Sequence, residues 1–163
     1  MRNKVPLFGI YIALALIFSY IELLIPINFG LPGAKLGLAN LVILIVLYNS
    51  GWKDALIVSV VRILISGILF GNAFSIVYSM VGGIFSLFTM IVLKKTNKFS
   101  MIGISAVGGV THNIGQLFVA MVVLETVSVR YYLSLLILVG LFTGIIMGIV
   151  SKEVLKRLPT KSI

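Results

Sequence analysis

The polar residues best suited to binding or catalysis lie inside apolar segments of the chain. Arg62 stands about 15 Å deep in one segment at 1.5 Å per residue, and another segment carries His112 and Gln116 one helical turn apart. A polar group inside a membrane span is costly unless it has a partner or lines a cavity. These residues therefore predict either a buried site for a small molecule or hydrogen bonds between helices, and the residues alone leave both interpretations open.

Other polar residues are expected at similar depth. Glu22 and Asn40 belong to neighbouring segments, and Lys35 ends a loop rich in Gly and Pro. Their convergence from the outer side predicts a pocket that captures a small molecule from outside, with this loop closing over it. We expect Arg62, His112 and Gln116 to contact the ligand, together with Lys35, Asn40 and Asn113. Arg62 and Lys35 favour an anionic or electron-rich ligand.

The sequence lacks the sets of residues that bind metal ions or catalyse group transfer. The chain has one histidine, no cysteine and a single aspartate, Asp54. Zinc sites need several His or Cys ligands, and the magnesium ions that hold a diphosphate need clustered carboxylates. No phosphate-binding Gly-rich loop is present. We therefore expect no metal, no cofactor and no catalysis by this chain alone.

The elements that must position these residues are membrane helices. The 163 residues are 60% hydrophobic and 10% charged, with a mean hydropathy of +1.21, whereas soluble domains are about a quarter charged. At about 20 residues per span, the chain forms one domain, 1–163, and has no room for a soluble one. We predict an all-α polytopic membrane protein, a bundle of six transmembrane helices at about 6–25, 36–48, 52–70, 73–93, 100–124 and 132–150.

The basic residues predict the orientation of the bundle. Ten of the thirteen lie before the first predicted span, after the sixth, or in the connectors that share their side: Arg2, Lys4, Lys53, Lys94, Lys95, Lys98, Lys152, Lys156, Arg157 and Lys161. Basic loops are retained in the cytoplasm, so both termini are expected there, in the cell membrane. The net charge of +9 then belongs to span ends, where it meets lipid headgroups, and we expect no nucleic-acid partner.

Small residues recur at four-residue spacing, which lets helix backbones approach closely. Gly140, Gly144 and Gly148 form one such row in the last span. Packing within the bundle is the favoured explanation for this row. Gly9 and Ala13, near the cytoplasmic end of the first span, are the better candidates for contact with a partner protein.

Several motifs together resemble a known family. They are PGAKLGLANL from Pro32 to Leu41, Arg62, the GN pair at Gly71 and Asn72, and THNIGQL from Thr111 to Leu117. The chain resembles the Gx transporter family, also named heptaprenyl diphosphate synthase component I, over nearly its whole length. That family is similar in layout to the substrate-binding S components of energy-coupling factor transporters. The resemblance adds Asn72 to the expected ligand contacts.

The resemblance also implies partners. S components capture vitamins and related small molecules, and they dock through small residues of their first helix onto a transmembrane coupling subunit with a pair of cytoplasmic ATPases. By position, Gly9 and Ala13 would serve that contact here, although S components usually carry an alanine pair. The other hypothesis follows from the second family name: a non-catalytic membrane subunit of a prenyl diphosphate synthase. A purely structural bundle is the third.

Overall fold

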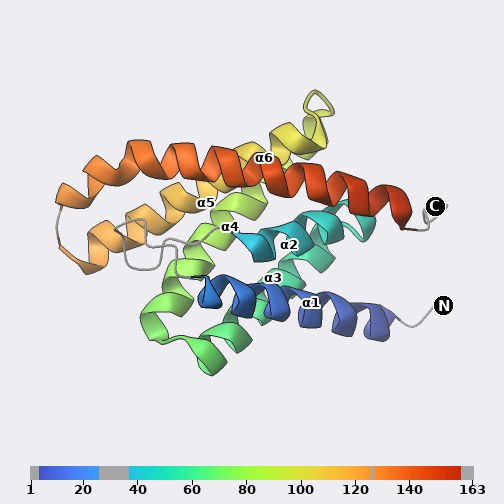
Figure 1. Ribbon diagram of the computed structural model, residues 1–163, viewed down its shortest axis with the longest axis horizontal. Coiled ribbons are helices and arrows are strands. Elements are labelled where there is room, and N and C mark those ends of the chain that lie inside the picture. The colour runs from blue at the N-terminus through green and yellow to red at the C-terminus, as the bar shows by residue number, and fades with distance from the viewer. Residues whose placement is uncertain (1–3, 26–36, 126, 159–163) are drawn as a thin grey trace.

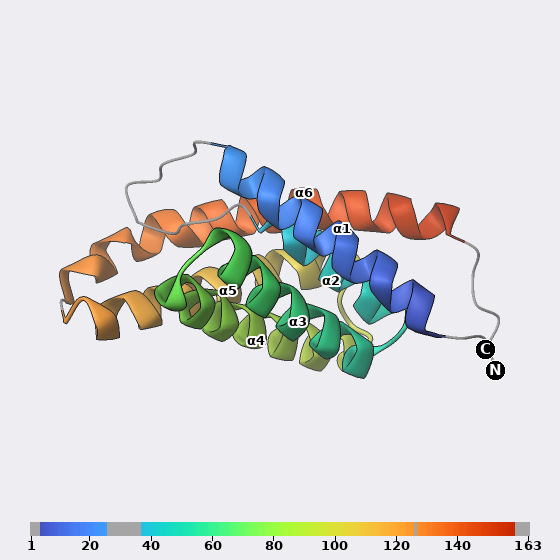
Figure 2. The ribbon, with the colours of Figure 1, turned by 90° about the horizontal axis from the view of Figure 1, so that it is seen from below.

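The computed structural model describes residues 4–25, 37–125 and 127–158, and it is all-α. Six α-helices occur, as the apolar segments predicted, with one short 3-10 helix before the last (Figure 1): α1 (Lys4–Leu24), α2 (Leu38–Asn49), α3 (Trp52–Phe70), α4 (Ala73–Thr96), α5 (Met101–Val123), η1 (Val127–Tyr132) and α6 (Leu133–Arg157). The start of α1 and the end of α6 lie at the same end of the molecule (Figure 2). That end also carries the start of α3 and the end of α4, so the basic connectors gather there.

Four segments are long and apolar enough to cross a membrane: Val5–Leu24, Ala73–Thr96, Met101–Val123 and Arg130–Arg157. These agree with a polytopic membrane protein. α3 is long enough, with 19 residues, but it is not among these four segments. Every 18-residue stretch of it contains three charged residues, Lys53, Asp54 and Arg62. α2 differs from the predicted second span, because its 12 residues extend only about 18 Å, well short of the ~30 Å hydrocarbon layer.

The short helix α2 lies in the core of the bundle. Eight of its residues are buried: Ala39, Leu41, Val42, Ile43, Leu44, Ile45, Val46 and Leu47. A helix that is apolar on every side is stable only when it is covered on every side. α1, α3 and α6 provide most of that cover. A fully enclosed α2 therefore has no outer face of its own to match to the lipid.

The C-terminal end of α2 is held by two long-range hydrogen bonds. Lys94 of α4 donates from Nζ to the carbonyl of Leu47 at 2.6 Å and lies 4.4 Å from the centre of the Tyr48 ring. Asn49 donates to the Tyr11 hydroxyl of α1 at 2.6 Å. Helix C-termini leave carbonyls without intrahelical partners and attract cations. Lys94 therefore anchors α2 at the basic end of the bundle.

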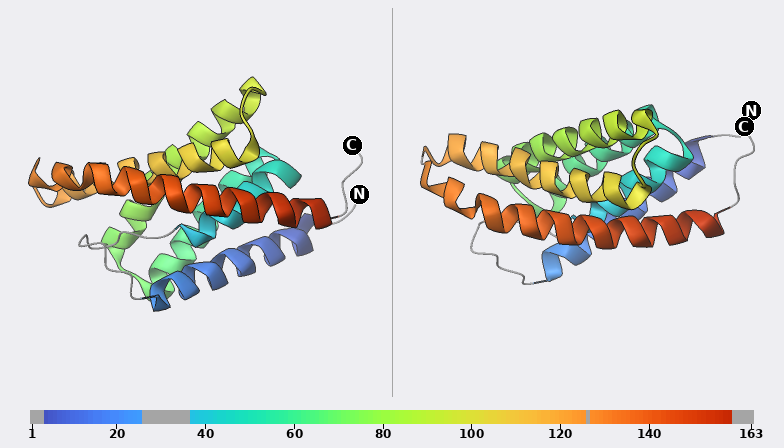
Figure 3. Two further views of the ribbon diagram at one scale, coloured as in Figure 1. Left: turned by 45° about the horizontal axis from the view of Figure 1, so that its top comes forward. Right: turned by 90° about the horizontal axis from the view of Figure 1, so that it is seen from above.

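Glycines set the spacing of α4, α5 and α6, which lie side by side with α5 in the middle (Figure 3). A Cβ on Gly109 would stand 2.2 Å from the Gly140 carbonyl oxygen, and one on Gly144 would stand 2.6 Å from the Ser105 carbonyl oxygen. Distances below 3.0 Å do not occur for real Cβ atoms. The row at Gly140, Gly144 and Gly148 packs inside the bundle, as predicted.

The other pair of small residues has a different environment. Gly9 and Ala13 are both exposed on the outer side of α1, and a Cβ on Gly9 would meet nothing within 4 Å. The neighbouring apolar side chains Ile10 and Ile17 are more than half exposed. This face of α1 therefore takes no part in packing the bundle.

Replacing Gly109 by alanine should destabilise the protein. The added methyl group would collide with the backbone of α6, and overpacking of this kind costs about 1–3 kcal/mol. Thermal unfolding in detergent should show a lower melting temperature for Gly109→Ala. Gly9→Ala is the matched control, because its methyl group enters open space, and it should leave the melting temperature unchanged. Equal melting temperatures for the two variants would contradict the packing described.

Replacing Lys94 by methionine should also destabilise the protein, by about 1–3 kcal/mol. The variant keeps much of the apolar stem but leaves the Leu47 carbonyl without its donor. Lys95→Met, at an exposed neighbouring position, is the control and should unfold like the unchanged protein. The midpoint of thermal unfolding measures both. A Lys94→Met protein as stable as Lys95→Met would show that the anchor at the end of α2 contributes nothing.

A candidate binding cavity at the start of α2

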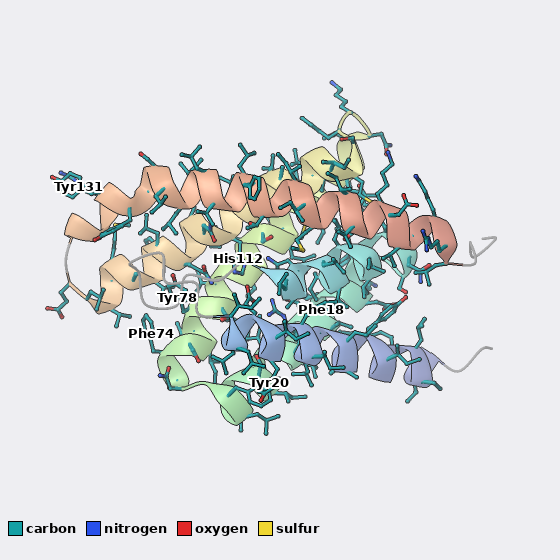
Figure 4. All side chains as sticks on the ribbon, in the orientation of Figure 1. Phe18, Tyr20, Phe74, Tyr78, His112 and Tyr131 are labelled. Carbon is teal, nitrogen blue, oxygen red and sulfur yellow. The ribbon has the colours of Figure 1, made fainter. Side chains whose placement is uncertain are left out.

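A cavity lies where the start of α2 meets α4, α5 and α6. Its polar lining comes from all four helices: Asn40, Ser86, Ser105, His112, Asn113 and Thr143. The rest of the lining is glycine and methionine: Gly37, Met90, Gly108, Gly109, Gly144 and Met147. Figure 4 shows His112 in the middle of the molecule, close to the start of α2. The cavity thus lies at the end of α2 that points away from the basic end.

The cavity is small. Its volume is about 20 Å³, enough for about one water molecule. Pockets for organic ligands are typically ~300–1,000 Å³. An organic ligand therefore enters only if the surrounding helices separate. The side formed by α5 and α6 is closed by direct backbone contact at Gly109 and Gly140, so the cavity can widen mainly on the side of α2.

The start of α2 is built on a glycine and a carboxylate. Gly37 precedes the helix with φ of +76°, a left-handed conformation that favours glycine. Its N–H donates to the Glu22 carboxylate near the end of α1. Gly37 also lines the cavity. The first turn of α2, and with it one wall of the cavity, is therefore tied to α1.

Arg62 stands behind this wall and does not line the cavity. Its side chain is only 7% exposed, and Nη2 donates to Oδ1 of Asn40 at 3.4 Å. The Glu22 carboxylate also acts electrostatically on the guanidinium group. Both neighbours come from the elements that form the wall, so Arg62 joins α3 to α1 and α2. Arg62 therefore reaches the cavity lining only through its contact with Asn40, and a contact between Arg62 and a ligand stays a prediction.

The polar strip of α5 faces the interior, as predicted. His112 and Asn113 line the cavity, and Asn113 donates from Nδ2 to the Leu136 carbonyl of α6 at 2.8 Å. Gln116 is only 1% exposed but lies outside the cavity lining. Neither amide atom of Gln116 has a hydrogen-bond partner among the described residues. Asn113 therefore connects two helices and also lines the cavity.

Two other expected contacts are elsewhere. Asn72 is exposed at the start of α4, where Oδ1 accepts from the Ser75 N–H at 2.8 Å and the Ser75 hydroxyl accepts from the Asn72 N–H. This reciprocal cap explains the GN pair by local structure, and it does not bring Asn72 to the cavity. Lys35, and the loop expected to close over the pocket, lie outside the described residues.

Sequence reasoning missed the contribution of α4. Ser86 is 1% exposed, lines the cavity and has no hydrogen-bond partner for its hydroxyl among the residues described. Its position was visible in the sequence, because Gly82, Ser86 and Met90 follow one another at four-residue spacing in an apolar span. Thr143 of α6 lies three residues after Gly140 and directly before Gly144. Small and polar residues on one helical face mark the side that meets other helices.

Comparison with known proteins gives one match. A family model for heptaprenyl diphosphate synthase component I matches residues 11–154, a range that includes every residue of the cavity lining. No curated protein and no solved structure matches the chain. Since the match covers most of the chain and the same motifs that carry the resemblance, the chain belongs to the heptaprenyl diphosphate synthase component I family.

Proposed function

We propose that this chain is the substrate-binding subunit of a membrane uptake system and that the cavity at the start of α2 holds its small-molecule ligand. The observation that carries the proposal is the buried hydroxyl of Ser86, which lines the cavity without a hydrogen-bond partner among the described residues. A buried polar group without a partner costs about 1–3 kcal/mol. A ligand that supplies the missing hydrogen bond would remove that cost.

The position of the cavity supports capture from outside. The described basic residues of the connectors and the last helix end belong to the end of the bundle opposite η1, and basic ends are retained in the cytoplasm. In this orientation both termini are cytoplasmic. The cavity lies at the start of α2, the end of that helix away from the cytoplasmic side, and about half-way along α5 and α6. Tyr131, exposed at the far end (Figure 4), then lies near the outer surface.

The outer face of α1 supports docking onto a partner. Gly9 and Ala13 are exposed there and have no role in the bundle. A glycine with open space above it lets a second helix approach closely inside the membrane. We propose that a transmembrane coupling subunit docks on this face and that a pair of ATPases supplies the energy.

A second function is favoured by the family's name. In that case the chain would be a membrane-embedded accessory subunit of a heptaprenyl diphosphate synthase. Its four acidic residues are far apart in the sequence, at Glu22, Asp54, Glu125 and Glu153. The magnesium ions of the reaction would therefore be held by a catalytic partner, and this chain would bring that partner to the membrane.

The two functions differ in what purifies with the protein. Extracted in mild detergent from its native host, the protein should retain a membrane coupling subunit, two ATPases and a small molecule, all identified by mass spectrometry. Gly9→Leu should lower recovery of the coupling subunit severalfold, since the leucine blocks close helix approach. Its melting temperature should stay unchanged, because the position is open.

Leu138→Ala, on the exposed face of α6, serves as the control for a general change in the lipid-facing surface and should not affect recovery. Recovery of a soluble prenyl synthase subunit in place of the coupling subunit, unaffected by Gly9→Leu, would contradict the uptake role. It would support the accessory-subunit function instead.

A further inference from the structure

One side-chain amide in the cavity wall has its orientation fixed by Arg62. A guanidinium group has only hydrogen-bond donors. The Asn40 atom that faces Arg62 Nη2 must therefore be the acceptor Oδ1, as the 3.4 Å contact has it. The Nδ2 group, with two N–H donors, then turns toward Gly37, where a Cβ would stand 3.3 Å from it. Gly37 and Asn40 both line the cavity, so the Nδ2 donors lie beside the lining of this wall.

The Asn113 amide is also fixed in orientation, but here the N–H group is bound and the oxygen is left over. Asn113 donates from Nδ2 to the Leu136 carbonyl at 2.8 Å, and a carbonyl oxygen can only accept. The amide cannot be turned round without placing two acceptors together. Its Oδ1 is therefore the atom left to face the cavity, so the α5 side of the cavity presents an acceptor opposite the donors of α2.

His112 is the one titratable side chain of the described lining. No Lys, Arg, Asp or Glu belongs to the cavity wall as far as the chain is described. The Arg62 guanidinium is directed at Asn40 and lies within the electrostatic influence of Glu22. Phosphate or carboxylate oxygens in the cavity would face the acceptor of Asn113, and no Lys or Arg of the described lining would balance their charge. Burying a charge without a partner is costly.

We propose, resting on the ligand-binding function above, that the cavity takes a neutral head group of the amide or cyclic imide class. Its carbonyl oxygen accepts from Asn40, and its N–H donates to Asn113. The Ser86 hydroxyl, buried in the same lining, completes the set as donor or acceptor. Arg62 is a positioning residue: it fixes the Asn40 amide and does not itself contact the ligand.

Three probes test the head-group class on the full chain in lipid nanodiscs. Uracil has an imide with N–H and carbonyl groups, 1,3-dimethyluracil has the same carbonyls without an N–H, and inorganic pyrophosphate is an anion. Titration calorimetry should give a dissociation constant for uracil at least about tenfold lower than for 1,3-dimethyluracil, since a site that hydrogen-bonds its ligand rejects analogues without the bond. Pyrophosphate should bind more weakly than uracil.

Three variants test the role of Arg62. Asn40→Asp keeps an acceptor for Arg62 but removes both N–H donors, and it should weaken uracil binding at least about tenfold. Arg62→Gln can donate or accept, so it frees the Asn40 amide and should also weaken binding. Arg62→Lys is the conservative variant, since its ammonium group has donors only. It should bind uracil about as tightly as the unchanged protein, unlike Arg62→Gln. Melting temperatures of all three identify any variant that fails to fold.

The outcomes separate this inference from the function on which it rests. Equal binding of uracil and 1,3-dimethyluracil, tighter binding of pyrophosphate, or no binding of uracil overturns the head-group class. Unchanged uracil binding in Asn40→Asp overturns the role of Asn40, and with it that of Arg62. A native ligand recovered with the protein that proves to be an anion overturns the inference but leaves the uptake function intact. Recovery of a prenyl synthase subunit and no ligand overturns the function itself.

Discussion

The rest of the structure depends on the short helix α2 enclosed within longer ones. With 12 residues it reaches about 18 Å, so it fills the core at the basic end of the bundle and stops before the other end. Lys94 and Asn49 hold its C-terminal end, and Glu22 and Arg62 hold its beginning. The cavity lies at the start of α2, because beyond this point α2 no longer fills the space between the longer helices.

Polar residues in the membrane are usually explained either as ligand contacts or as links between helices, and in this protein two residues that link helices also line the cavity. Arg62 contacts Asn40, and Asn40 lines the cavity; Asn113 both ties α5 to α6 and lines the cavity. The buried Arg62 guanidinium therefore acts on the cavity lining through Asn40. In the proposed binding site, this arrangement would fix the direction of the hydrogen bonds offered to a ligand while keeping the Arg62 guanidinium out of the described lining.

Much of this architecture could be predicted from the sequence, and the part that could not has a physical reason. Hydropathy gave the six helices, and spacing placed His112 and Gln116 on an interior face. Depth along a helix did not reveal that Arg62 points at Asn40, since side-chain direction depends on neighbours far away in the chain. Asn72 was assigned to the ligand by resemblance, yet a local cap with Ser75 explains it. Ser86 was missed because its four-residue spacing from Gly82 and Met90 marks a face that meets other helices, and this spacing does not distinguish a cavity from close packing.

The proposed function requires that the space at the start of α2 binds a small molecule. An experimental density map of the protein purified from its native membrane tests it most directly. We expect density for a bound small molecule between Asn40 and Asn113, with α2 moved away from α5 and α6. Density for a ligand at another position, or a cavity filled only by a water molecule in protein that carries its native ligand, would contradict it.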